Sequence, residues 1–294
     1  MMRINSSLTA LSPAKLNLFL HITGRRADGY HNLQTLFQFV DLCDELSFET
    51  TQDSALTLDF PGGDIAPEQN LIFRAALALR QSTGCEQGAK IRVEKNIPMG
   101  GGLGGGSSNA ATTLVALNTL WNLKLNTQTL CNIGVKLGAD VPIFIHGHAA
   151  IATGVGEVFE NVEISEPYYL LGVPPCHVPT ARLFQEKQLT RDSRTITLCA
   201  FLNGEGHNDF EPVTRKLFPE VESAMTALNQ VGKAQMTGTG ACVFASFPSR
   251  NSAEAALGEL SRISGQQPLA STRWTIVRGL NKSPLYTGKL ARQF

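Results

Sequence analysis

Six of the seven residues 100–106 are glycine, and two serines, Ser107 and Ser108, follow them directly. Glycine loses more backbone entropy on folding than any other residue, so such a run is destabilising unless it serves a purpose. An amphipathic helical pattern comes next, and the N–H groups of a glycine turn ahead of a helix N-terminus can hold an anion. The pattern predicts a phosphate-binding loop, with both serines as helix caps or as hydroxyl contacts to a phosphate or Mg²⁺. A flexible linker is the alternative, but linkers rarely lead directly into such a helix.

The surrounding residues exclude several known types of phosphate-binding loop. A Walker loop is excluded because no lysine precedes the serines. Gly100, Gly102 and Gly105 fit a dinucleotide-binding pattern, but that fold places an acidic residue about 20 positions later. Here no Asp or Glu occurs from Lys95 through Ala139, which suits a highly charged anion such as a triphosphate. The HRD and DFG motifs of protein kinases are also absent.

Asp140 ends that acid-free interval. Phosphoryl transfer needs positioning, charge neutralisation and a group that accepts the proton of the attacking hydroxyl. Asp140 could take that proton, or it could cap a turn before Pro142, and the spacing alone favours neither. Lys15 begins an apolar strand, where a lysine is usually a solvated edge charge. Near a carboxylate and a phosphate, it would instead keep Asp140 ionised and stabilise the transferring group.

Two further patterns carry weaker signals. Small residues at Thr237-Gly238-Thr239-Gly240-Ala241 would let the backbone approach a ligand closely, although a tight turn before a strand explains them equally well. The spacing His146-x-His148 could hold a metal, but a turn is the simpler interpretation.

The elements that must position these residues are a mixture of strands and helices. Lys15 to Ile22 alternates with Leu16, Leu18, Leu20 and Ile22 on one face, which predicts a half-buried strand, and Asp28-Gly29 is a turn signal. We expect further strands at 33–40, 45–50, 55–60, 90–94, 149–153, 168–173, 242–247 and 273–277. Helices are expected at 70–81 with Asn70 as cap, at 110–121 and at 127–137. Residues 138–142 should be irregular, since Pro142 disfavours helix at the residue before it.

This mixture lacks a strict βαβ rhythm, so the sequence favours an α+β fold. The weakest-packed stretch lies near Gly154 to Ser165, which divides the chain into domains 1–155 and 156–294.

Composition excludes several classes of function. Lys plus Arg number 25, and so do Asp plus Glu. Because the chain is neutral and has no basic run, its charge pattern does not suggest binding to nucleic acid or to an anionic membrane. Hydrophobic residues make up 43%, enough for a real core. The six cysteines form no CxxC pair, and the N-terminal residues lack the apolar region of a secretory signal. We therefore expect a cytoplasmic protein with reduced thiols.

Three blocks stand in order along the chain: 12–18 (SPAKLNL), 98–109 (PMGGGLGGGSSN) and 237–241 (TGTGA). Together they resemble the superfamily of galactokinase, homoserine kinase, mevalonate kinase and phosphomevalonate kinase (GHMP). SPAKLNLFL, ADGYH and GADVP resemble one family within it, the 4-diphosphocytidyl-2-C-methylerythritol kinases of the non-mevalonate route to isoprenoid precursors. The resemblance implies an ATP-dependent kinase that phosphorylates the 2-hydroxyl of the cytidyl-diphosphate polyol, with Mg²⁺ as the ATP counter-ion. It also implies a two-domain α+β fold, with an N-terminal ATP-binding domain, a C-terminal substrate-side domain and the active site in the cleft between them.

The resemblance also implies residue roles. Lys15 and Asp140 would be the catalytic pair. The ATP site would comprise Asn70, Lys95, Pro98, Met99, Gly100, Gly101, Gly102, Leu103, Gly104, Gly105, Gly106, Ser107 and Ser108. The substrate site would comprise Asn17, Tyr30, His31, Thr180, Phe184, Gly238, Thr239 and Gly240. No protein ligand for a metal is assigned. Another GHMP-type kinase and a nucleotide-binding regulator without catalysis remain as alternatives, and the presence of both Lys15 and Asp140 argues against the regulator.

Overall fold

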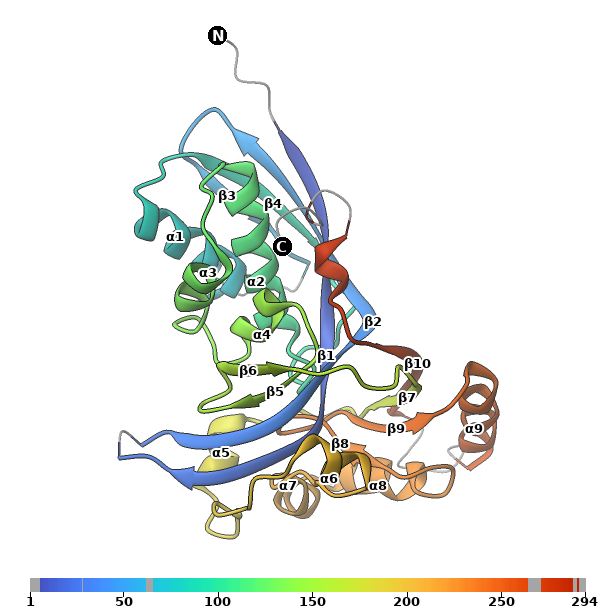
Figure 1. Cartoon of the computed structure of the whole chain (residues 1–294). Coiled ribbons are helices and arrows are strands. Elements are labelled where there is room, and N and C mark those ends of the chain that lie inside the picture. Colours follow the sequence, from blue (N-terminus) through green and yellow to red (C-terminus); the bar gives the residue numbers. More distant parts are fainter. Residues whose placement is uncertain (1–5, 28, 62–65, 264–270, 288–289, 291–294) are drawn as a thin grey trace.

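The structure, a computed structural model, describes residues 6–27, 29–61, 66–263, 271–287 and 290. Within them, strands and helices mix as expected for an α+β fold, and these residues form two lobes joined along two long strands (Figure 1). Asp28 of the expected turn lies outside the described residues. Its neighbour Gly29 has φ 88°, and its N–H donates to the carbonyl of Arg26.

The two long strands form the frame of the molecule. β1 (Ser7–Arg25) pairs antiparallel with β2 (His31–Thr51), so that Lys15 lies opposite Phe39. The two strands expected at 33–40 and 45–50 are therefore one. The expectation that 15–22 is half-buried is wrong, because every residue there is buried. The glycine loop and the segments around 194, 207 and 237 all hydrogen-bond to this part of β1 and exclude water from both faces.

The remaining strands extend this frame on both sides. The order is β3-β4-β2-β10-β7-β9-β8, with β1 and β5 also paired to β2 and β6 paired to β5. Their bounds are β3 (Leu56–Asp59), β4 (Gly88–Glu94), β5 (Ala150–Thr153), β6 (Val158–Asn161), β7 (Tyr168–Val173), β8 (Gln235–Met236), β9 (Val243–Phe247) and β10 (Arg273–Leu280). β6 falls within the stretch chosen for the domain boundary, and the division at 155/156 stays a prediction.

The helices form two groups, one in each lobe (Figure 1). The first comprises α1 (Leu71–Thr83), α2 (Gly105–Leu120), α3 (Thr127–Gly134) and α4 (Val141–His146). The second comprises α5 (Thr180–Gln185), α6 (Leu198–Leu202), α7 (Glu211–Leu217), α8 (Pro219–Leu228) and α9 (Arg250–Ile263). Asn70 caps α1 as expected, because its side chain accepts the N–H of Ile72 at 2.9 Å. In the described part of the chain, no helix is long and apolar enough to cross a membrane.

Two helices near the glycine loop differ from expectation. α2 begins at Gly105 rather than Ala110, and its residues 108–118 are all buried, so it is a central helix rather than an amphipathic one. Tertiary packing thus overrides the poor helix propensity of its first residues. α4 begins at Val141, with Pro142 in its first turn, where a missing N–H costs nothing. The expectation that 138–142 is irregular therefore fails for Val141 and Pro142.

The core has three parts. One lies under α1–α4 and includes Phe39 and Leu114, and another lies under α7–α9 and includes Val221. The third surrounds the middle of β1 and joins Leu16 and Phe19 of the first lobe with Phe244 of the second. A shared apolar core at β1 keeps the two lobes in register where the chemistry-bearing residues sit.

Candidate active site

A cavity of 1580 Å³ opens between the two lobes and is lined by the glycine loop, β1 and segments of the second lobe. Pockets for one small ligand are commonly about 300–1,000 Å³. This cavity is therefore large enough to hold two substrates at once.

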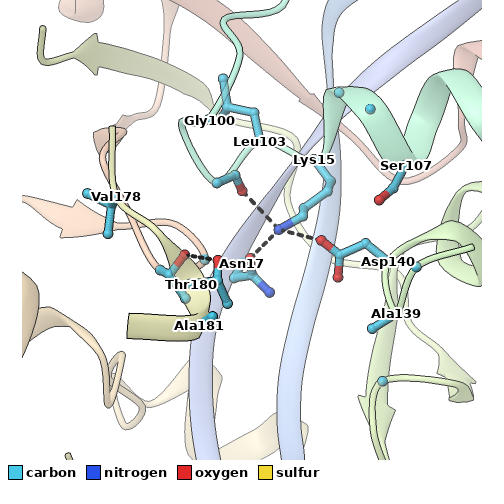
Figure 2. Close-up of a pocket in the computed structure, with 18 of the residues that line it drawn as sticks. Lys15, Asn17, Gly100, Leu103, Ser107, Ala139, Asp140, Val178, Thr180 and Ala181 are labelled. Atoms are coloured by element: carbon cyan, nitrogen blue, oxygen red, sulfur yellow. Dashed lines mark hydrogen bonds and ion pairs between the residues drawn. The ribbon is translucent and has the colours of Figure 1, made fainter. Parts of the chain in front are cut away.

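Lys15 lies at its centre, almost fully buried (Figure 2). Its Nζ donates to Asn17 Oδ1 at 2.5 Å and to the carbonyl of Gly102 at 2.9 Å, and it lies 3.4 Å from Asp140 Oδ2. An ammonium has three donors, and these three oxygens account for all of them. Lys15 is thus a fixed interior charge rather than a solvated edge residue.

Asp140 immediately precedes α4, where a carboxylate could cap the helix. Within the described residues, its side chain makes no such capping bond and points instead toward Lys15 (Figure 2). The carboxylate is 38% exposed, in contrast to the buried lysine. This geometry leaves one face of Asp140 open to a ligand in the cavity.

The glycine loop wraps over Lys15. Gly100, Gly102 and Gly104 have φ of 74°, 77° and 73°, a region that favours glycine. Gly104 is the N-cap of α2, and a Cβ there would lie 3.2 Å from Lys15 Cε and 2.8 Å from Phe144 Cζ. The N–H groups that begin α2 therefore open beside the catalytic candidates, as an anion site requires.

The two serines after the loop have separate environments. Ser107 lines the cavity on the Asp140 side (Figure 2). Ser108 does not line it. Its hydroxyl is buried and accepts a hydrogen bond from Ser12 Oγ at 2.8 Å.

The third sequence block closes the cavity from the second lobe. The Thr237 hydroxyl accepts the N–H of Asn17 at 2.9 Å, and a Cβ on Gly102 would overlap the Thr237 carbonyl. Thr239 and Thr180 share a hydrogen bond of 2.9 Å. All three blocks therefore meet around Lys15, and the block 237–241 is more than a local turn before β9.

The cavity has two contrasting ends. Asn70 and Lys95, which the resemblance assigns to the ATP site, line it near α1. Tyr30, His31 and Phe184 line it near α5. The His31 ring stacks on Phe184, with centroids 4.9 Å apart and planes at 20°, while the Tyr30 side chain is 67% exposed. Partial burial and the charges of Arg191 and Arg25 lower the pKa of His31, which favours the neutral form of the ring.

Several lining residues were not foreseen from the sequence. Arg25, Arg26 and Arg191 bring positive charge to the aromatic end, and His177 packs against Gly100. The Arg191 guanidinium donates to the carbonyls of Phe184, Glu186 and Leu189, and so holds the end of α5. No local pattern marks these residues, since their importance comes from contacts with distant segments.

The described residues contain no group of three or more His, Cys, Asp or Glu side chains that could hold a metal ion. His146 instead pairs with Asn161 on β6. Asp140 and Ser107 both line the cavity, and carboxylate and hydroxyl oxygens are of the kind that Mg²⁺ prefers.

Comparisons with known proteins agree with this geometry. The family model described as the GHMP kinases N terminal domain matches residues 70–148, and the GHMP kinases C terminal model matches 187–265. A 4-diphosphocytidyl-2-C-methyl-D-erythritol kinase of Shewanella baltica (strain OS195) is 50% identical over 277 residues, covering 94% of this chain and 95% of the relative. The enzyme of that name from Methylococcus capsulatus is 50% identical over 283 residues, covering 95% and 94%.

A solved structure extends the likeness to three dimensions. The crystal structure of a 4-(cytidine 5'-diphospho)-2C-methyl-D-erythritol kinase has a TM-score of 0.78 and 32% identity, and the match covers 92% of this chain and 99% of that one. These likenesses confirm the expected α+β GHMP fold. The chain belongs to the 4-diphosphocytidyl-2-C-methyl-D-erythritol kinase family of GHMP kinases.

Proposed function

We propose that this chain transfers the γ-phosphoryl group of ATP to the 2-hydroxyl of 4-diphosphocytidyl-2-C-methyl-D-erythritol, in the non-mevalonate route to isoprenoid precursors. The substrate is the one in the names of its relatives. The observation that carries the proposal is the Lys15–Asp140 pair directly beneath the glycine loop.

The triphosphate would lie against the loop N–H groups and the start of α2, with Asn70 and Lys95 toward the nucleoside. Ser107 and Asp140 line the cavity where they would hold Mg²⁺ beside the phosphates, and the bound ion would neutralise part of the phosphate charge.

At the reacting centre, Asp140 would accept the proton of the 2-hydroxyl while the oxygen of that hydroxyl forms a bond to the γ-phosphorus. The bond from the γ-phosphorus to the bridging oxygen breaks, and ADP leaves. Lys15 would favour the ionised form of Asp140 and stabilise the negative charge that moves between phosphates and hydroxyl. Because three oxygens already fix its ammonium, Lys15 needs no rearrangement during the reaction.

The acceptor end of the cavity suits a cytidyl diphosphate. The stacked rings of His31 and Phe184 offer a flat apolar surface for a base. The guanidinium groups of Arg25, Arg26 and Arg191 line the same end and match the negative charge of a diphosphate. Thr180, Gly238, Thr239 and Gly240 lie between this end and Lys15, where the polyol would bind.

The direct test is ADP release by the purified protein with ATP, Mg²⁺ and one alcohol at a time. We expect turnover of the cytidyl-diphosphate polyol and none of methylerythritol phosphate, mevalonate or homoserine. The Asp140→Asn variant, purified identically, controls for contaminating kinases. Efficient turnover of homoserine or mevalonate would assign another GHMP activity, and ATP binding without turnover of any alcohol would favour the regulator.

A further inference from the structure

A buried carboxylate lies behind the glycine loop, outside the cavity. Asp44 of β2 has no exposed surface. Its Oδ1 accepts the backbone N–H groups of Asn96 and Ile97, each at 2.8 Å, and its Oδ2 accepts Asn109 Nδ2 at 2.8 Å and Lys95 Nζ. A buried charge is costly unless it is paired and hydrogen-bonded, and Asp44 meets both conditions.

The hydrogen bonds continue into a network of five side chains. Lys95 Nζ donates to Asn109 Oδ1 at 3.2 Å, Asn109 Nδ2 donates to Ser12 Oγ at 2.9 Å, and Ser12 Oγ donates to Ser108 Oγ. We call Ser12, Asp44, Lys95, Ser108 and Asn109 the Asp44 network. It connects the strand that carries Lys15, the segment after β4 and the beginning of α2.

The network ends at the cavity through Lys95. Among the described residues, Asp44 and Asn109 engage two of the three donors of its ammonium, which leaves one to meet a ligand. A Cβ on Gly105 would lie 3.6 Å from Lys95 Nζ, so the held ammonium is beside the first residue of α2. Without a partner, a long lysine side chain would extend into water and would have to be ordered each time a ligand binds.

We propose that Asp44 is a positioning residue for ATP, because its carboxylate holds Lys95 in the cavity and anchors the loop segments on either side. This rests on the proposed ATP site at the glycine loop. Asp44 touches no substrate itself and acts through Lys95. The alternative is that Asp44 only stabilises the fold, and the two are separated by measuring nucleotide affinity and thermal stability independently.

The first test is Asp44→Asn in the full chain, with ATP affinity measured by calorimetry without any alcohol substrate. An asparagine can keep one oxygen for the N–H groups of Asn96 and Ile97, but its NH₂ would face the donors of Lys95 and Asn109. We expect the Kd for ATP to rise about tenfold or more, the scale of one charge-assisted hydrogen bond. The KM for the alcohol substrate should change much less.

The matched control is Asp41→Asn, which removes a carboxylate from the same strand. Asp41 is exposed and accepts the backbone N–H of Arg278 at 2.8 Å, a bond that an asparagine can keep. Its ATP affinity should equal that of the wild type. An equal loss of affinity in both variants would reduce the effect to net charge and overturn the proposal.

A double-mutant cycle tests the route of action. If Asp44 acts through Lys95, then Asp44→Asn combined with Lys95→Met binds ATP as weakly as Lys95→Met alone. Additive losses, or an Asp44→Asn variant with wild-type affinity, would overturn the proposal.

A second variant serves if Asp44→Asn does not fold, which thermal unfolding will show. Asn109→Leu removes the other side-chain partner of Lys95 with a side chain of the same branched shape, and we expect its Kd for ATP to rise several-fold. Wild-type affinity there would also contradict the proposal. If the wild type itself binds no ATP, the proposed function has failed, whereas normal ATP binding with the wrong alcohol specificity leaves the role of Asp44 intact.

Discussion

At the scale of single residues, the site depends on how Lys15 is held. The side chain is only 3% exposed, and its neighbours are an amide, a carbonyl and a carboxylate. These three oxygens hold the ammonium in one direction. The mechanism therefore assigns proton transfer to Asp140, which remains accessible, and electrostatic stabilisation to Lys15.

Asp140→Asn should lower kcat about 10²-fold or more while ATP still binds, because it removes the proton acceptor and leaves the phosphate loop intact. Initial rates with the cytidyl-diphosphate polyol, together with calorimetric titration of ATP, measure both quantities. Lys15 keeps its bonds to Asn17 and Gly102 in this variant, so a general collapse of the site is not expected. Near-normal turnover would remove Asp140 from the mechanism.

Lys15→Met should lower kcat more than it raises either KM. The methionine fills most of the buried volume, but the charge that stabilises the transferring group is lost, and this charge matters most in the transition state. Steady-state kinetics separate kcat from KM, and thermal unfolding monitors the cost of losing the hydrogen bond from Lys15 to Asn17 Oδ1. A loss confined to substrate affinity would make Lys15 a binding residue only.

At the scale of elements, the glycine loop and α2 act as one unit. The loop backbone approaches β1, since the Lys15 N–H donates to the Leu103 carbonyl at 3.0 Å, and it approaches the second lobe, since the Cys242 N–H donates to the Gly101 carbonyl at 3.1 Å. These close approaches require glycines for packing, in addition to any contact with phosphates. The earlier start of α2 places Gly105, Gly106 and Ser107 in its first turn, where N–H groups have no partner within the helix.

Gly104→Val should raise the KM for ATP sharply. The residue has φ 73°, and a side chain there would meet Phe144 and Lys15 at the mouth of the loop. The matched control is Gly84→Val at the end of α1, which has φ 67°, no atom within 4 Å of the added Cβ and no place in the cavity lining.

Gly84→Val should lose about 1–2 kcal/mol of folding stability from the left-handed backbone, measured by chemical unfolding. Gly104→Val should lose more, because its side chain also meets Phe144. Only Gly104→Val should change the KM for ATP. An unchanged KM in a folded Gly104→Val protein would show that the loop does not hold the phosphates.

At the scale of the whole molecule, the cavity is shared by both lobes. The start of α1, Lys15 of β1, and α5 with the residues near the tip of the β1–β2 pair all line it. Residues from both lobes meet at β1, because the N–H of Asn17 donates to the Thr237 hydroxyl. Asn208 of the second lobe in turn donates to the carbonyls of Met236 and Gly238, on either side of Thr237. The frame thus fixes the distance between the two ends.

This arrangement predicts a sequential mechanism in which ATP and the alcohol are bound together. Direct transfer needs both ligands at Lys15 and Asp140 simultaneously, and the 1580 Å³ cavity is large enough for them. Double-reciprocal plots at several fixed concentrations of the second substrate should intersect. Parallel lines, or exchange of label between ADP and ATP without the alcohol, would indicate a phosphoenzyme and contradict direct transfer.

The sequence by itself determined most of the local structure, and it predicted that the glycine loop binds phosphate. Glycine content, the absence of acidic residues and the following apolar run indicated an anion site, because backbone conformation and local charge depend on nearby residues. Periodicity placed strands and helices near their observed positions, including the capped start of α1 at Asn70. The roles of Lys15 and Asp140 came from resemblance, since the residues alone left both open.

Only the tertiary structure decided which side chains meet. The interval from Lys95 to Ala139 contains no acid, yet Asp44, 51 residues before Lys95, places a buried carboxylate on the flank of the loop. Arg191 reaches the aromatic end from a segment without a recognisable motif, and burial on both sides of β1 follows from segments far apart in the chain. Local patterns record which face of an element is apolar, but pairing between distant segments leaves no local trace, because it depends on how the whole chain packs.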